Sequence, residues 1–138
     1  MNDPSPTPPP CRPAVTFVMP AYNAAPYIDE AIGSIVAQSF VDWELIVVDD
    51  HSTDDTAMRA REWARREPRI RVLQTERQTG AAFIPRKTAI EAAGSDLICC
   101  VDADDRIAPD FMQRLMRRRL ETGADIVYPS MWSLGGGT

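Results

Sequence analysis

The sequence predicts an α/β fold in which a mostly parallel β-sheet lies between two layers of helices. Short apolar runs along the chain lack the alternation of polar and apolar residues that marks a strand with one exposed face. Stretches with a helical spacing of apolar residues separate these runs. Buried strands that are joined through helices form parallel sheets, so the two observations together predict a three-layer α/β/α sandwich.

The first strand and the first helix are predicted around two prolines. Residues 15–19, VTFVM, are a buried-strand candidate that ends at Pro20. Pro26 suits the first turn of a helix, where a backbone N–H group would have no partner in any case. The apolar positions of this helix lie on a single face, and they are Ile28, Ala31, Ile32, Ile35 and Val36.

A second strand and a second helix follow. Residues 44–48, ELIVV, predict the strand. Thr53 or Asp54 can then cap a helix that closes at Pro68. Residues 70–74, IRVLQ, predict a third strand directly after this helix.

The last part of the chain repeats the same alternation. Residues 86–93 predict a third helix that ends at Gly94, and residues 97–101, LICCV, predict a fourth strand. Pro109 starts a fourth helix, and residues 125–129, DIVYP, are expected to form a fifth strand.

The chain of 138 residues is expected to hold one folded domain. Residues 1–13 contain half of the twelve prolines and are expected to form a disordered leader. Residues 14–130 are the expected domain, truncated at its C-terminal side, and residues 131–138 are an expected flexible tail.

Composition excludes several classes of function. A formal net charge of −5 argues against a nucleic-acid partner that is held by bulk electrostatics. No apolar run approaches the roughly 20 residues of a membrane-spanning helix. The three cysteines have neither zinc-ligand spacing nor a disulfide pattern, so a reducing, cytoplasmic setting is expected.

Polar residues follow three of the predicted strands, at residues 20–23, 49–54 and 102–105. Ligands of open parallel sheets bind beyond the carboxyl ends of the strands, so we expect these three loops to converge on one site. A carboxylate directly after the second strand, at Asp49 or Asp50, suits an N–H group of a nucleobase such as uracil.

The third loop carries Asp102, Asp104 and Asp105 within four positions. Oxygen ligands in such a cluster suit Mg²⁺ or Mn²⁺, which would leave coordination positions for phosphate oxygens. The alternative is that Asp102 caps a turn and the other two carboxylates are solvated, because Asp is common in loops.

Three segments together carry a resemblance to a known family. They are VTFVMPAYNAAPYIDEAIGSIVAQSF, WELIVVDDHSTDDT and CVDADDRIAPDF. In this order and spacing the chain resembles the N-terminal, nucleotide-sugar-binding part of family 2 glycosyltransferases, over roughly residues 14–128. The resemblance implies a Rossmann-like GT-A fold, a nucleotide-diphospho-sugar donor with a UDP-sugar as first choice, a divalent metal, and inversion at the anomeric carbon by direct displacement.

The resemblance also implies roles for individual residues. Pro20, Ala21 and Tyr22 would line the nucleoside pocket, and Asp50 would hold the base. Arg86 would reach the donor phosphates. The segment around Arg86 departs from the family pattern, because Lys87 and Ala89 stand where the family commonly has Asn and Gly.

In the acidic loop, Asp102 and Asp104 match the DxD pair of the family. Asp102 would lie nearer the ribose or the diphosphate, Asp104 would be the more direct ligand of Mn²⁺ or Mg²⁺, and Asp105 would orient the donor sugar. The general base is expected in a C-terminal part that the chain does not contain, so no catalytic residue is assigned. The acceptor is an unknown glycan, lipid or polysaccharide precursor, and peripheral association with the inner face of the membrane stays open.

Two other functions are compatible with parts of the pattern. A non-catalytic nucleotide-sugar-binding fragment would share the fold and the donor site. A receiver-like signalling domain also places acidic residues after strands, but it begins with the strand that bears the acidic pair and needs a lysine after a later strand. Here a complete strand and helix come first, and no lysine follows Lys87.

Overall fold

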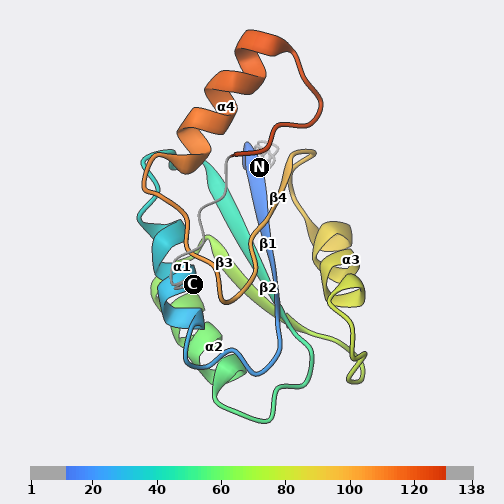
Figure 1. Cartoon of the computed structure of the whole chain (residues 1–138). Coiled ribbons are helices and arrows are strands. Elements are labelled where there is room, and N and C mark those ends of the chain that lie inside the picture. The colour runs from blue at the N-terminus through green and yellow to red at the C-terminus, as the bar shows by residue number, and fades with distance from the viewer. Residues whose placement is uncertain (1–11, 130–138) are drawn as a thin grey trace, which may run out of the picture.

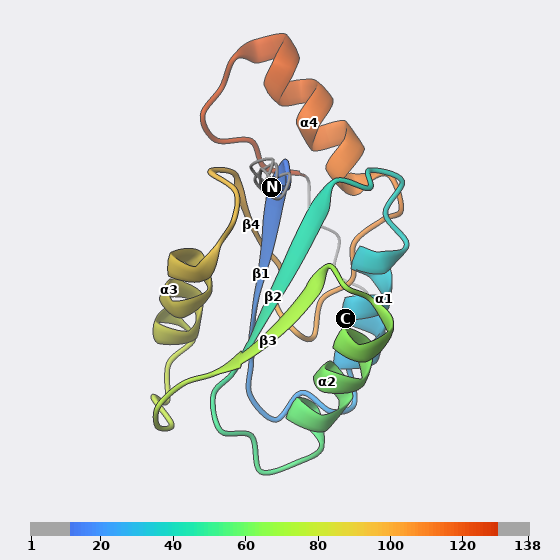
Figure 2. The ribbon, with the colours of Figure 1, turned by 180° about the vertical axis from the view of Figure 1, so that it is seen from behind.

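The computed structural model describes residues 12–129, which form a four-stranded parallel sheet with helices on both faces. The strand order is β3-β2-β1-β4. Helix α3 covers one face of the sheet, while α1 and α2 lie side by side on the other (Figures 1 and 2). Helix α4 stands at the end of the sheet opposite the loops that leave β1 and β2 (Figure 1). The predicted α/β sandwich is therefore confirmed.

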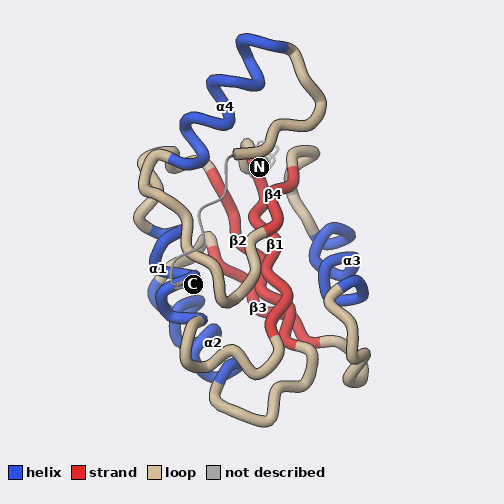
Figure 3. Tube along the Cα trace, in the orientation of Figure 1, coloured by secondary structure: helices blue, strands red, loops and turns tan. Residues whose placement is uncertain are grey.

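The strands of the sheet are β1 (Val15–Ala21), β2 (Trp43–Asp49), β3 (Ile70–Gln74) and β4 (Ile98–Cys100). The helices are α1 (Ile28–Val36), α2 (Thr56–Arg66), α3 (Phe83–Ala92) and α4 (Phe111–Thr122), and they alternate with the strands along the chain (Figure 3). None of the helices within residues 12–129 combines the length and the apolar character that crossing a bilayer requires.

The central strands are buried on both faces, which explains their unbroken apolar sequences. Phe17 and Met19 of β1 face the layer of α1 and α2, whereas Val18 packs toward α3 with Ile46. Ala89 of α3 completes this second, smaller cluster and is fully buried. Apolar burial of this kind contributes roughly 25 cal/mol per Å² and fixes the layers against each other.

The register of the sheet brings the strand ends to one edge. Pro20 and Ala21 at the end of β1 lie opposite Val48 and Asp49 at the end of β2. Strand β4 pairs with β1 only as far as the Val18–Cys100 pair, and the following Val101 donates its N–H to the Val18 carbonyl at 3.0 Å. The polar loops after these three strands therefore start at the same edge of the sheet.

The prediction of a fifth strand at residues 125–129 was wrong. The structure gives this segment no strand, and within the described residues β4 pairs with β1 alone. The segment is apolar enough for a strand, but a strand also needs a partner that supplies backbone hydrogen bonds. Helix α3 begins at Phe83, earlier than predicted, because Pro85 fits within its first turn.

The predicted leader and tail lie almost wholly outside the described residues. Of the leader, only Arg12 and Pro13 are described. The Arg12 Nε donates to the Gly94 carbonyl at 3.1 Å, so these two residues are attached to the end of the domain that is remote from the polar loops.

Candidate functional site

A pocket of about 360 Å³ opens at the edge of the sheet where β1, β2 and β4 end. It is lined by residues that the sequence singled out on four different segments: Pro20, Ala21, Tyr22, Asp50, Arg86, Asp102 and Asp104. Asp105 is the exception, because it lines a separate cavity of about 570 Å³ between β4 and α4. The pocket thus has an apolar and aromatic wall, one buried carboxylate, and two aspartates from the loop after β4 at its rim.

The loop after β1 is fastened to the loop after β2 through Asn23. Its N–H donates to the Ser52 hydroxyl at 3.0 Å, and its Oδ1 accepts from the Thr53 N–H at 2.8 Å. These bonds hold Asn23 at a φ of 47°, in the left-handed region that asparagine tolerates better than most residues. The turn places the neighbouring Tyr22 at the pocket wall, where its side chain is about half exposed.

Asp54 and Thr56 make a second connection between these loops. The Thr56 hydroxyl accepts from the Ala24 N–H at 2.8 Å, and Asp54 accepts from the Ala25 N–H at 3.2 Å and from the Thr56 N–H at 3.0 Å. Burial alone would raise the pKa of Asp54, but the hydrogen bonds from Thr56 and Ala25 outweigh it and hold the pKa below its ordinary value. Asp54 therefore works as an ionised anchor at the start of α2.

Asp50 is buried at the base of the pocket and accepts four hydrogen bonds. Its Oδ1 accepts from the Thr75 hydroxyl and from the Thr79 N–H, both at 2.9 Å. Its Oδ2 accepts from the Thr79 hydroxyl at 2.9 Å and from the Gly80 N–H at 3.2 Å. Burial alone would raise the pKa of Asp50, but the donors on Thr79, Thr75 and Gly80 lower it further than burial raises it. Asp50 is therefore a stable carboxylate that also fixes the loop between β3 and α3.

Arg86 extends from α3 to the acidic rim. Its guanidinium donates to Asp102 at 2.7 Å, and this hydrogen bond raises the pKa of Arg86. Both side chains are well over a third exposed, so the pair contributes little to stability. The bond instead holds the positive charge of Arg86 beside the carboxylates of the loop after β4. The adjacent Lys87 points elsewhere and lies 3.9 Å from Glu91 on its own helix.

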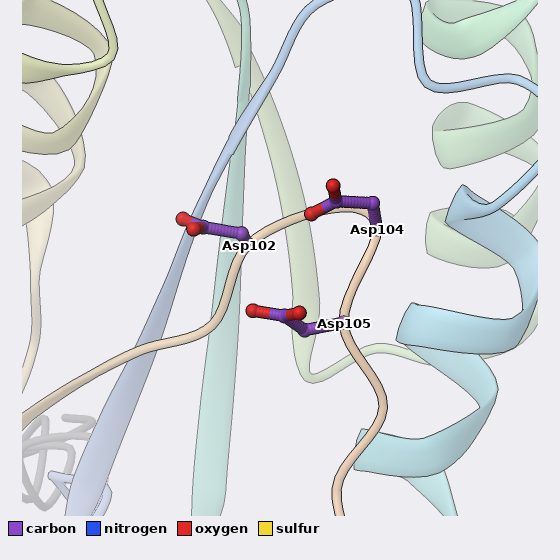
Figure 4. Close-up of side chains that lie close together, drawn as sticks. All are labelled: Asp102, Asp104 and Asp105. Atoms are coloured by element: carbon purple, nitrogen blue, oxygen red, sulfur yellow. The ribbon is translucent and has the colours of Figure 1, made fainter. Parts of the chain in front are cut away.

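The acidic rim consists of Asp102, Asp104 and Asp105, whose side chains lie close together on the loop after β4 (Figure 4). The Asp105 N–H donates to the Asp102 carbonyl at 3.0 Å, which makes the loop a tight turn. One carboxylate oxygen from each residue lies within 4.8 Å of those of the other two. Burial and the charges of Asp104 and Asp102 raise the pKa of Asp105.

The acidic rim fits a hard divalent cation. Its donors are all carboxylate oxygens, which Mg²⁺ and Mn²⁺ prefer. Two ligands on one ion at roughly 2.0–2.6 Å each are separated by no more than about 5 Å, which agrees with the spacing of these oxygens. Burial and, in addition, repulsion from Asp104 and Asp102 raise the pKa of Asp105, and a bound cation would relieve this repulsion.

No local sequence pattern connects Asp50 with the residues that donate to it. Thr75, Thr79 and Gly80 belong to the connection between the third predicted strand and the third predicted helix. The Thr-Gly pair at 79–80 is the sequence feature that indicates a turn here, because glycine after a polar residue marks a turn. Gly80 has a φ of 71°, and this left-handed turn aims its N–H at Asp50.

The pocket wall also contains residues that the sequence left without a role. Asn23 and Tyr27 follow Tyr22 on the segment between β1 and α1, and Ala81, Ala82 and Pro85 line the side toward α3. Tyr27 is about half exposed and stands directly before α1. An aromatic residue at a helix start gives no functional signal by itself, so only the folded loop shows that Tyr27 lines the same pocket as Tyr22.

Comparison with known proteins supplies independent findings. Residues 16–138 match the family described as glycosyl transferase family 2. The chain is 34% identical over 110 residues to the putative teichuronic acid biosynthesis glycosyltransferase TuaG of Bacillus subtilis, an overlap of 80% of this chain and 43% of TuaG. The chain thus spans less than half the length of this relative.

Two solved structures resemble the fold closely. S. aureus TarS 1–349 in complex with UDP superimposes with a TM-score of 0.83 at 29% identity, over 91% of this chain and 37% of that one. The mannosyltransferase PcManGT from Pyrobaculum calidifontis, in complex with GDP-Man and Mn²⁺, superimposes with a TM-score of 0.70 at 31% identity, over 78% of this chain and 32% of that one.

Proposed function

This chain belongs to glycosyl transferase family 2, and from that premise we propose that its pocket binds the nucleotide-diphospho-sugar donor of an inverting glycosyltransferase. The observation that carries the proposal is that the Tyr22 side of the wall, the buried ionised Asp50, and Asp102 and Asp104 of the acidic rim all line one cavity. A volume of about 360 Å³ lies within the range of small-molecule sites. Membership of this family also removes the receiver-like alternative.

The nucleoside would occupy the inner part of the pocket. Tyr22 offers an aromatic face for the base or the ribose, and Pro20 and Ala21 contribute apolar lining to the same pocket. Asp50 would accept an N–H group of the base, since it is ionised and can only accept hydrogen bonds. A UDP-sugar is the first candidate, and the UDP complex of TarS supports it.

The diphosphate would lie at the acidic rim. Asp104 and Asp102 would hold Mn²⁺ or Mg²⁺, and the PcManGT complex with Mn²⁺ supports this assignment. Such an ion supplies neutralisation of the diphosphate and so makes it a better leaving group. Arg86 adds a fixed positive charge at the same place, held by its bond to Asp102. Asp105 would orient the donor sugar from the outer side of the loop.

Transfer would proceed by displacement at the anomeric carbon. The acceptor hydroxyl attacks from the face opposite the diphosphate, its proton passes to a general base, and the diphosphate leaves with inversion. We place the general base and the acceptor site in a part of the whole enzyme outside residues 12–129. The acceptor would be a glycan, a lipid or a polysaccharide precursor.

The test is calorimetric titration with UDP, GDP and dTDP, each with and without Mn²⁺. We expect one nucleotide to bind only with Mn²⁺, and Asp104→Ala to weaken this binding at least about tenfold, as loss of a metal ligand requires. The matched control is Asp96→Ala, because the Asp96 side chain is 93% exposed and its ion pair with Arg12 is long, at 3.7 Å. Equal binding by Asp104→Ala and wild type, or no binding by the folded protein, would contradict the proposal.

A further inference from the structure

The carboxylate of Asp50 has no acceptor position to spare. A carboxylate offers about four lone-pair sites, and each oxygen of Asp50 already accepts two hydrogen bonds. An N–H group of a nucleobase can therefore reach Asp50 only if one of the present donors withdraws.

Three of the four donors are held in place. The N–H groups of Thr79 and Gly80 are backbone donors within a left-handed turn and cannot rotate away. The Thr75 hydroxyl is buried, and its only acceptor among the described residues is Asp50. Withdrawal of the Thr75 hydroxyl would leave a buried donor without a partner, and withdrawal of either N–H would require the turn itself to open.

The Thr79 hydroxyl is different, because it has two acceptors for a single proton. Its Oγ1 lies 2.9 Å from the Asp50 Oδ2 and 3.1 Å from the Ala81 carbonyl oxygen. A hydroxyl donates only one hydrogen bond in the direction of its proton. Rotation of the proton from one acceptor to the other frees a lone pair on Asp50 without breaking the turn.

We propose that Thr79 is a specificity-determining residue whose hydroxyl turns from Asp50 to the Ala81 carbonyl when the imide N–H of a uracil-type base binds Oδ2. The inference rests on the proposed function, since it takes the pocket as a nucleotide site. A base with an imide N–H replaces the donor that leaves, so Asp50 keeps four hydrogen bonds. A base without this donor gains nothing from the exchange.

The exchange has a measurable cost. In the free protein Thr79 donates to a charged oxygen, and in the complex it donates to a neutral carbonyl. Charge-assisted hydrogen bonds are roughly twice as strong as neutral ones, so the exchange reduces the contribution of the base N–H to affinity by about fivefold. Removal of the Thr79 hydroxyl should therefore raise the contribution of the base N–H to affinity by about fivefold.

The experiment compares UDP with N3-methyl-UDP, which lacks the imide proton, by calorimetry with Mn²⁺. The quantity of interest is the ratio of the two affinities in wild type, Thr79→Val and Thr79→Ser. We expect the ratio to rise about fivefold in Thr79→Val and to stay at the wild-type value in Thr79→Ser, which keeps the hydroxyl. Thr79→Ala is a second variant without the hydroxyl and should match Thr79→Val.

A purely structural role for Thr79 predicts a different result. Thr79→Val would then weaken UDP and N3-methyl-UDP by the same factor, the ratio would not change, and the inference would be overturned. A ratio near one in both wild type and Thr79→Val would overturn it as well, because the imide proton would then contribute nothing even without the competing hydroxyl. Failure of the wild type to bind either nucleotide would instead refute the proposed function, and the inference with it.

Discussion

Replacement of Asp50 by asparagine is the substitution for which the structure makes the sharpest prediction about stability. The side chain keeps its shape, but one acceptor oxygen becomes an NH₂ donor and the negative charge is lost. On the Oδ2 side, the Thr79 hydroxyl can accept from the new NH₂ group and donate to Ala81 instead. The Gly80 N–H has no such alternative and would face another donor.

The magnitude follows from these contacts. Loss of the hydrogen bond from the Gly80 N–H costs about 1 kcal/mol, because Gly80 is exposed and water can reach this donor, and the two bonds on Oδ1 weaken because their acceptor is no longer charged. We therefore expect Asp50→Asn to lower the free energy of unfolding by about 2–4 kcal/mol. That is a large fraction of the roughly 5–15 kcal/mol typical of a domain.

Urea denaturation followed by tryptophan fluorescence measures this change, since Trp43 is buried in the core. With a slope of about 1–3 kcal/mol per molar urea, the midpoint should fall by about 1–2 M. The control is Asp55→Asn, an exposed residue before α2 whose side chain makes no capping hydrogen bond; its midpoint should stay within error. Equal midpoints for Asp50→Asn and wild type would refute the account of this site.

The lowered pKa of Asp50 also predicts how the stability difference between wild type and Asp50→Asn changes with pH. The pKa of Asp50 lies below its ordinary value of 3.8 in the folded protein. A depressed carboxylate pKa contributes stability that is fully present above the unfolded pKa and is lost as the pH falls through the folded pKa. The difference in stability between wild type and Asp50→Asn should therefore be constant near neutral pH and shrink below about pH 4.

Three further predictions concern the core, the turn and the cysteines. Ile46→Ala should lower the free energy of unfolding by about 2–5 kcal/mol in thermal melts, because Ile46 is fully buried; an unchanged melting temperature would contradict the packing of the α3 layer. Gly80→Ala and Gly123→Ala both strain a left-handed turn by about 1 kcal/mol, but only Gly80→Ala should also weaken Mn²⁺-dependent UDP binding in calorimetry; equal effects on binding would count against the turn. Burial raises the pKa of Cys99 to about 12, so peptide mapping after alkylation at pH 8 should show slower labelling of Cys99 than of the exposed Cys100, and equal rates in the folded protein would disprove that burial.

Much of the fold could be predicted because it depends on local patterns. Strands β1, β2 and β4 are largely apolar runs, β3 is a shorter run with Arg71 and Gln74 in it, and each lies between prolines, glycines or polar loops that end it. Residues 125–129, which form no strand, are the exception. Their composition suits a strand, but whether a strand forms depends on a partner elsewhere in the chain, and a run of residues carries no information about its partner.

Part of the candidate site could likewise be predicted from the sequence, and part of it could not. The rule that ligands bind at the carboxyl ends of parallel strands predicted that Tyr22, Asp50 and Asp104 would lie near one another, and the structure places all three around one pocket. The partners of Asp50 and the bond from Arg86 to Asp102 were not predicted. They join residues that are 16–30 positions apart through the path of the loop between β3 and α3, which no local pattern determines.

The central claim is that the acidic rim holds a divalent cation beside the bound nucleotide, and paramagnetic NMR tests it most directly. Substoichiometric Mn²⁺ is added to the ¹⁵N-labelled protein in the presence of UDP, because Mn²⁺ broadens only nearby amide signals. The account predicts that the amides of residues 102–105 disappear first, that those of α2 persist, and that Asp104→Ala abolishes this selectivity. Broadening that is centred elsewhere, or that is the same in Asp104→Ala, would contradict it.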